Sequence, residues 1–284
     1  MRVTVCELPP EPDALEAAWA RLRVHTRRHL SELVLLPEFA MVEPLWQGEH
    51  FDDARWTAAQ SISQAWHGRL AELNALRVVG TRPVTVAGRR YNEGYIWSAG
   101  AGVSPLRRKF FLPDEPGGRE ARWFDRGDAA FPAFHASGLS FGVNICTELW
   151  ALDTFATYAA QGVQAILSPR ATAAATTDKW LSVGVVAAVR SGAFSLSSNR
   201  VDPSGECGGV GWIISPDGDV LARTDPYEPF ATMNIDLAAS VAARNDYPRY
   251  VFSRARATGS FPDSSASPSI CEGSCGPWTT APTR

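Results

Sequence analysis

The chain alternates between short apolar runs and longer segments in which apolar residues recur at helical spacing. Runs of roughly four to eight apolar residues predict buried strands, whereas a spacing of about three to four residues predicts an amphipathic helix. Strands are predicted at Val3–Glu7, Leu33–Leu36, Arg77–Gly80, Val84–Ala87, Tyr91–Ser98, Arg107–Leu112, Leu139–Ile145, Ala165–Leu167, Phe194–Leu196, Val210–Ile214 and Phe230–Ile235. Helices are predicted at Pro12–Leu30, Asp53–Leu76, Leu149–Ala160 and Lys179–Val189. Strands alternating with helices, with a few hairpins between them, predict an α/β fold that contains mixed sheets.

Two segments lack this periodicity. Residues 113–128 are rich in glycine, proline and charge, which predicts a loop. Residues 257–284 are rich in serine, proline, glycine and threonine and hold few apolar side chains, which predicts a disordered tail. No repeat and no linker precedes residue 256. We therefore expect one domain at residues 1–256, followed by the tail at residues 257–284.

Composition narrows the classes of function. The chain has 284 residues and a net charge of −3, with a pI near 6.0, so no overall basic field favours nucleic acid. Its five cysteines are an odd number without regular spacing, which argues against a disulfide framework. The N-terminus lacks the features of a signal peptide, and no apolar run reaches the ~18 residues of a membrane helix. The sequence therefore predicts a cytoplasmic protein with no membrane or nucleic-acid partner.

Cys146 stands where a strand is predicted to end and a helix to begin. It closes the apolar run FGVNIC and precedes TELW. A residue at such a turn points out of the end of the sheet, where backbone N–H groups, such as that of Thr147, can stabilise a thiolate or an oxyanion. Free cysteines are often simply buried, so position alone favours a structural cysteine.

Glu38 and Lys109 are two further candidates. Glu38 follows the apolar run in LVLLPEFA, and a carboxylate at the end of a buried strand is costly unless it is paired. Lys109 lies in PLRRKFFLP, between two arginines and two phenylalanines. Taken alone, Glu38 is equally well interpreted as a capping carboxylate, and Lys109 is better interpreted as a solvated surface cation. With Cys146 they form a complete set, because a carboxylate can take the thiol proton and an ammonium group can stabilise a tetrahedral oxyanion.

The order of these segments resembles that of the nitrilase, or carbon–nitrogen hydrolase, superfamily. LLPEFA, RRKFFLP and NICTELW stand in the order of the family's Glu, Lys and Cys motifs. GVQAILSPRA, FSLSSNR, GGVGWIISPDGDVLA and TMNIDL are similar to its later segments. The resemblance covers about residues 1–250, and the ordered set is far more specific than any single motif.

The resemblance implies a role for each matched residue. Glu38 would be the general base, Lys109 the cation that stabilises the oxyanion, and Cys146 the nucleophile that forms a thioester. The family often has a second carboxylate after the lysine, followed by aromatic residues and Gly-Asp. Glu120 in EARWFDRGD fits that placement, and Glu115 is the alternative.

The resemblance also implies a fold and a substrate class. The fold is an α/β four-layer α-β-β-α sandwich with two mixed β-sheets, commonly paired as a homodimer. The substrate is a small-molecule amide or N-carbamoyl compound, which is cleaved without a cofactor or metal to release ammonia or an amine. Nitriles are the alternative, but nitrile-cleaving members often have Trp-Glu where this chain has Thr147-Glu148. Arg190-Ser191, where the family commonly holds Glu-Asn, also leaves the subfamily open.

Other functions are less well supported by the sequence. No histidine follows Cys146, so a cysteine–histidine hydrolase would depend on His135. Metal-type spacings occur at His25–His29 and Cys271–Cys275, both without further ligands. A binding protein that retains the fold without turnover is the non-enzymatic alternative, and the three candidate catalytic residues argue against it.

Overall fold

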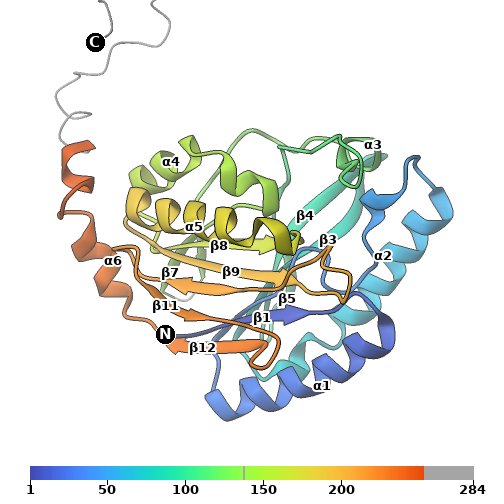
Figure 1. The fold of residues 1–284 in the computed structure, drawn as a ribbon, viewed down its shortest axis with the longest axis horizontal. Coiled ribbons are helices and arrows are strands. Elements are labelled where there is room, and N and C mark those ends of the chain that lie inside the picture. The colour runs from blue at the N-terminus through green and yellow to red at the C-terminus, as the bar shows by residue number, and fades with distance from the viewer. Residues whose placement is uncertain (137, 253–284) are drawn as a thin grey trace, which may run out of the picture.

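The computed structural model describes residues 1–136 and 138–252 (Figure 1). The expected tail at residues 257–284 lies outside these ranges. The helices are α1 (Pro12–His29), α2 (Asp53–His67), α3 (Glu120–Trp123), α4 (Asp153–Gln161), α5 (Thr177–Ser191) and α6 (Leu237–Ala243). The strands are β1 (Arg2–Leu8), β2 (Leu33–Leu35), β3 (Arg77–Val86), β4 (Arg89–Ser98), β5 (Gly102–Arg108), β6 (Phe134–Ala136), β7 (Leu139–Val143), β8 (Ala165–Arg170), β9 (Phe194–Arg200), β10 (Trp212–Ile214), β11 (Val220–Arg223) and β12 (Phe230–Asn234). Among these described helices, none is long and apolar enough to cross a membrane.

The strands confirm a mixed α/β fold but differ from the expected pair of separate sheets. They follow the order β5-β4-β3-β2-β1-β9-β8-β7-β6, with β12 added to β1 and the β10–β11 hairpin added to β9. The connection between the two halves is made by the end of β1, where Glu7 and Leu8 pair in parallel with Asn199 and Arg200 of β9. The two halves are therefore parts of one large, nearly closed mixed sheet.

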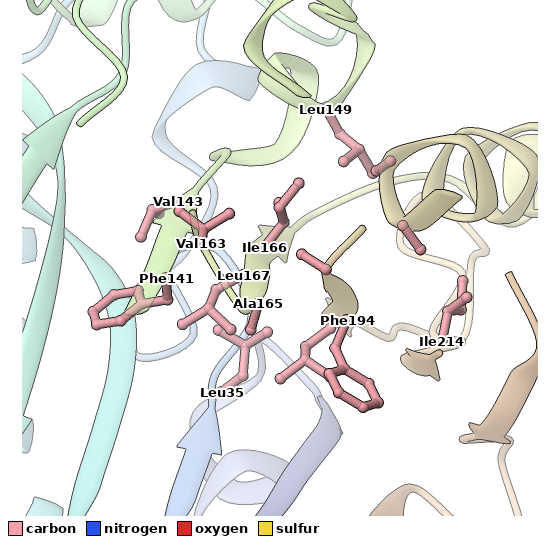
Figure 2. Close-up of a cluster of buried hydrophobic side chains, with 14 of the residues drawn as sticks. Leu35, Phe141, Val143, Leu149, Val163, Ala165, Ile166, Leu167, Phe194 and Ile214 are labelled. Atoms are coloured by element: carbon pink, nitrogen blue, oxygen red, sulfur yellow. The ribbon is translucent and has the colours of Figure 1, made fainter. Parts of the chain in front are cut away.

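Two apolar cores explain why the central strands are apolar throughout. Leu33 and Leu35 of β2 join a core that also includes side chains of β7, β8, β9 and α5 (Figure 2). Val34, on the opposite face of the same strand, joins a second core with residues of α1 and α2 such as Trp19 and Trp56. Successive side chains of a strand point to opposite faces, so a strand covered on both sides needs apolar residues at every position.

Pro83 lies inside strand β3, where the sequence predicts a turn. The sequence predicts two strands with a proline-containing turn between them, whereas β3 runs without interruption from Arg77 to Val86. In β3, Pro83 pairs with Asn92 of β4. β2 pairs with β3 only as far as Val79, so among the described strands the later part of β3 has a single neighbour. An edge position of this kind tolerates the missing N–H of proline.

Several shorter elements also differ from the predictions. The helix predicted to run to Leu76 ends at His67, before Gly68, and is followed by a short 3-10 turn. The predicted loop at residues 113–128 contains α3, which carries Glu120. The strand predicted at Arg107–Leu112 is displaced to Gly102–Arg108. Strands β6 and β11 and helix α6 are too short to show a clear period.

Candidate active site

Glu38, Lys109 and Glu120 form one buried ionic cluster. The Lys109 Nζ lies 2.9 Å from Glu38 Oε1 and 2.7 Å from Glu120 Oε1. The three residues are only 1%, 1% and 4% exposed, in the order Glu38, Lys109, Glu120. Burying charged groups at this depth is costly even when they are paired, and such clusters gather at functional sites. The structure thus brings together three residues that the sequence places 71 and 11 positions apart.

Glu38 is fixed by bonds to two residues of other strands, Arg170 of β8 and Asn92 of β4. Its N–H donates to the Arg170 carbonyl at 3.1 Å, and its Oε1 accepts a 2.8 Å bond from Asn92 Nδ2. The next residue, Phe39, has a left-handed φ of 46°, which a non-glycine residue adopts only when its surroundings hold it there. The buried Arg200 donates to the carbonyl of Phe39 at 2.6 Å and supplies that constraint.

Lys109 follows the last residue of β5 and is held through its main chain. Its N–H donates to the Asn92 carbonyl at 2.8 Å, and its carbonyl accepts from the Gly127 N–H at 2.9 Å. A side chain at Gly127 would collide with the backbone of Arg108, so only glycine permits this approach. Asn92 therefore positions both Glu38, through its side chain, and Lys109, through its carbonyl.

Cys146 lies at a sharp turn between β7 and a 3-10 turn at Cys146–Trp150. Its φ is 48°, again in the left-handed region, and its side chain is 5% exposed. The thiol receives a hydrogen bond from the backbone N–H of Ala171, which follows β8. This is the strand-to-turn geometry in which hydrolases hold a nucleophile at the end of a sheet.

The charges of the cluster act on the thiol. Burial raises the pKa of Cys146, Glu38 raises it further, and Lys109 lowers it. Burial lowers the pKa of Lys109, but the two carboxylates outweigh it, so the net shift is upward and the side chain stays charged. Burial raises the pKa of Glu120 to about 7, against the opposing effect of Lys109. The site therefore combines a fixed cation with a carboxylate that exchanges a proton near neutral pH.

A cleft of about 750 Å³ opens onto these groups. Cys146, Thr147 and Glu120 line it, and its walls include Trp46 and Trp180. A second cavity of about 340 Å³ lies between α1, α2 and the segment after Glu38, but its lining holds no cysteine, histidine or lysine. The candidate chemistry belongs to the larger cleft.

Other candidates from the sequence lie elsewhere. Glu115 is exposed at the mouth of the cleft, and the contact to Lys109 is made by Glu120. His135 is exposed on β6 and does not line the cleft. His25 and His29 stack on each other at 4.3 Å, and no cluster of metal-ligating side chains occurs among residues 1–136 and 138–252. The pair Cys271–Cys275 lies outside the described residues.

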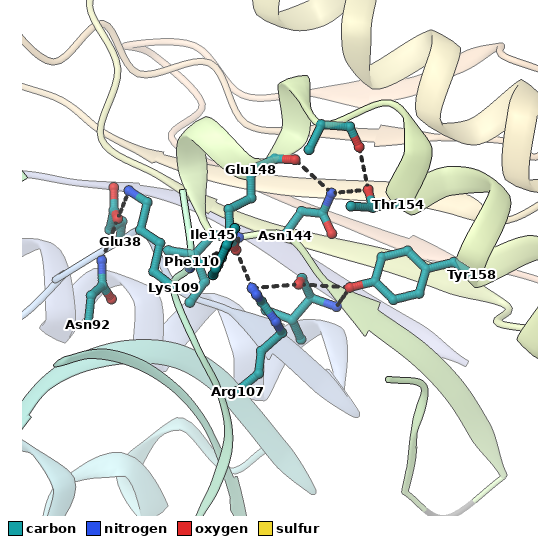
Figure 3. Close-up of polar contacts among 12 residues, drawn as sticks. Glu38, Asn92, Arg107, Lys109, Phe110, Asn144, Ile145, Glu148, Thr154 and Tyr158 are labelled. Atoms are coloured by element: carbon teal, nitrogen blue, oxygen red, sulfur yellow. Dashed lines mark hydrogen bonds and ion pairs between the residues drawn. The ribbon is translucent and has the colours of Figure 1, made fainter. Parts of the chain in front are cut away.

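Sequence reasoning missed three contacts at the site. Asn92 could have been suspected, because asparagine is uncommon inside strands and here lies within the predicted strand Tyr91–Ser98. The bond from Ala171 comes from the backbone, which no side-chain pattern reveals. The sequence singles out Glu148 only as part of the motif that follows Cys146. In the structure it is fully buried and contacts both the cysteine turn and the segment after β5 (Figure 3).

Comparison with known proteins decides the family. A model of the carbon–nitrogen hydrolase family matches residues 2–245. The chain belongs to this family. This confirms the superfamily that the sequence resembles.

Curated relatives of this carbon–nitrogen hydrolase are distant. It is 25% identical over 178 residues to an N-carbamoylputrescine amidase of Solanum lycopersicum, an alignment that covers 56% of this chain and 59% of that protein. It is also 25% identical over 152 residues to an N-carbamoylputrescine amidase of Arabidopsis thaliana, covering 48% and 51%. The matched part thus spans less than two thirds of each relative.

Solved structures support the fold. A carbon–nitrogen hydrolase from Helicobacter pylori G27 is similar with a TM-score of 0.78 and 18% identity, over 88% of this chain and 94% of that one. An amidase from Nesterenkonia sp. is similar with a TM-score of 0.69 and 17% identity, over 89% and 95%. At these identities the likeness establishes the nitrilase-type fold alone.

Proposed function

We propose that this enzyme hydrolyses a carbon–nitrogen bond of a small-molecule amide or N-carbamoyl compound through a thioester on Cys146. The observation that carries the proposal is the buried Lys109 between Glu38 and Glu120, because Glu120 lines the same cleft as Cys146. A scaffold would gain little from burying these charges, because an apolar cluster of the same volume is as stable or more so.

Acylation would use Glu38 as the base. Its Oε2 has no hydrogen-bond partner among the described residues, and Glu38 has a larger effect on the thiol pKa than Glu120. It takes the proton as Sγ bonds to the carbonyl carbon, and the carbonyl electrons move to oxygen. Lys109 and the N–H of Thr147 stabilise that oxyanion. When the carbonyl re-forms, the C–N bond breaks and Glu38 returns its proton to the departing nitrogen.

Deacylation would reverse these transfers with water. A carboxylate accepts a proton from water as the water oxygen bonds to the thioester carbon. The C–S bond then breaks, and the carboxylate returns the proton to the sulfur. Glu120 orients Lys109 and the water, since it bonds Nζ through Oε1 while Oε2 has no partner among the described residues. Both products then leave through the cleft.

Amides and N-carbamoyl compounds are favoured over nitriles. The curated relatives above are N-carbamoylputrescine amidases, and this chain has threonine directly after Cys146. The cleft is large enough for a substrate longer than the reacting group, and its mouth carries Glu115, Glu206 and Lys179. The proposal includes the homodimer and the four-layer sandwich that the family resemblance implies.

The proposal is tested by measuring ammonia release from a panel of amides, N-carbamoyl amines, ureido acids and nitriles. Wild type should release ammonia from an amide or N-carbamoyl compound, and Cys146→Ala should release none. Cys6→Ala is the matched control, because Cys6 is equally buried and its thiol pKa is also raised, but it does not line the cleft. Wild-type rates in Cys146→Ala would refute the thioester mechanism.

A further inference from the structure

Among residues 1–136 and 138–252, Glu148 is the one carboxylate that accepts hydrogen bonds from main-chain N–H groups next to two proposed catalytic residues. Its Oε1 accepts a 2.7 Å hydrogen bond from the N–H of Phe110, the residue after Lys109. Its Oε2 accepts a 2.9 Å bond from the N–H of Ile145, the residue before Cys146. Figure 3 shows Glu148 between these two segments, which belong to opposite halves of the sheet.

A buried guanidinium supplies the countercharge. Arg107 Nη1 bonds to Oε2 of Glu148, and the Arg107 side chain lies over the ring of Phe131 at 4.1 Å. Arg107 belongs to β5, two residues before Lys109. With the bond from Phe110, the ion pair therefore makes a second connection between the end of β5 and the cysteine turn.

We infer that Glu148 is a positioning residue that fixes the cysteine turn against the segment carrying Lys109. The inference rests on the proposed function, because it assigns Glu148 a task in the same site. Cys146 has a left-handed backbone, which relaxes unless the turn is held. A displacement of about 1 Å between reacting groups can lower the rate roughly 100-fold, so a bridge of this kind affects the rate without touching substrate.

Replacing Glu148 with glutamine tests the two bonds that it accepts from the N–H groups of Phe110 and Ile145. A carboxylate offers two acceptor oxygens, whereas an amide offers one acceptor and one donor. In Glu148→Gln the NH₂ group must face either the N–H of Phe110 or the N–H of Ile145 and the guanidinium of Arg107. One side of the bridge therefore becomes a donor–donor contact.

Glu93→Gln is the matched control. Glu93 is also a buried carboxylate on the neighbouring strand, paired with Arg82 and Arg108. It contacts no backbone group next to Cys146. Both substitutions remove one buried charge from an arginine pair, and only Glu148→Gln breaks the link between the two catalytic segments.

The first readout is steady-state kinetics on an amide that wild type hydrolyses. Glu148→Gln should lower kcat by about 10- to 100-fold with little change in KM, because alignment is lost and binding is kept. Glu93→Gln should lower kcat far less. Equal kcat losses in the two variants would overturn the inference.

The second readout is the pH dependence of Cys146 alkylation by iodoacetamide, followed by intact-protein mass spectrometry. Displacing Lys109 from the thiol should move the midpoint upward by roughly one pH unit in Glu148→Gln but leave it unchanged in Glu93→Gln. An unchanged midpoint in both would overturn the inference. This readout needs no substrate, so it decides the role of Glu148 even if wild type hydrolyses nothing in the panel and the proposed function fails.

A double variant keeps the inference testable if Glu148→Gln folds poorly. Arg107→Met with Glu148→Gln removes both buried charges and keeps the volume, so its melting temperature should exceed that of Glu148→Gln. A positioning role predicts that kcat stays low despite the recovered stability. Recovery of kcat together with stability would show that Glu148 only supports folding.

Discussion

Two buried ionic clusters adjoin the end of β5, and they differ in how their carboxylate oxygens are bonded. In the cluster of Lys109, Oε2 of Glu38 and Oε2 of Glu120 have no hydrogen-bond partner among the described residues. In the cluster of Arg107, both oxygens of Glu148 are bonded. The clusters lie two residues apart on one segment, so the difference arises from local structure.

This difference distinguishes carboxylates that can accept a proton, Glu38 and Glu120, from a carboxylate that fixes the surrounding segments, Glu148. A buried acceptor without a partner is destabilising by about 1–3 kcal/mol, so a fold keeps it only where the surroundings enforce it. The same oxygen is the one that can accept a proton from a thiol or from water. A fully bonded carboxylate has no such freedom, and its bonds fix the segments that it joins.

The largest expected effect concerns Glu38. Glu38→Gln keeps the size of the side chain but cannot accept the thiol proton, so turnover should fall by up to about 10⁴-fold. No acyl adduct should form on Cys146 during turnover, as intact-protein mass spectrometry can show.

Glu120→Gln is the comparison for this experiment. It should still acylate and should accumulate the adduct, since its proposed task is to support the later step. If Glu38→Gln accumulates the adduct and Glu120→Gln never acylates, the two roles are reversed. If neither substitution matters, both carboxylates are structural.

The next effect in size concerns Lys109. Lys109→Ala should lower kcat by roughly 10²–10³-fold with a smaller change in KM, because an oxyanion donor acts mainly in the transition state. The check is a full rate-against-concentration curve on the same amide. Arg108→Ala is the control, since Arg108 is partly exposed and pairs with Glu93 outside the cluster. Equal damage from both would show that the wrong cation has been chosen.

The smallest expected effect is the contribution of Glu120 to the pH dependence of the melting temperature. Burial raises the pKa of Glu120 from an ordinary value of 4.5 to about 7. The folded protein then holds this proton to higher pH than the unfolded chain, so the contribution is complete below pH 4.5 and is lost as pH rises through about 7. Between pH 5 and pH 8, wild type should lose roughly 5–10 °C more in melting temperature than Glu120→Gln. Parallel curves would contradict the raised pKa.

The sequence predicted most of the fold because its central strands are apolar on both faces. β2, with the sequence LVL, is an example, and the long helix α1 showed its period equally well. Predictions failed where tertiary context decides: Pro83 is accommodated at a sheet edge, and α3 is a single turn without a period. The joining of the sheet halves through β1 depends on a backbone pairing that side-chain patterns do not encode.

The site divides in the same way. Glu38 and Cys146 could be named because charged or reactive side chains at strand ends are unusual against an apolar background. Lys109 became a candidate only beside these two, and Glu120 was named from the family resemblance. Their roles remain predictions. Contacts made by main-chain groups, such as that of Ala171, carry no residue-type signal and became visible only in three dimensions.

The pairing of β1 with both β9 and β12 has a consequence for how the chain assembles. β1 is synthesised first, yet its partners around Asn199 and Thr232 are among the last described residues to be made. Contacts between such distant positions close large loops and slow folding. During synthesis, β1 can pair with β2 early, but its other edge stays uncovered until β9 and β12 have been made. A nascent chain stalled before residue 194 should therefore present β1 with one open edge, the edge that β9 and β12 later cover, in a form that holding chaperones bind.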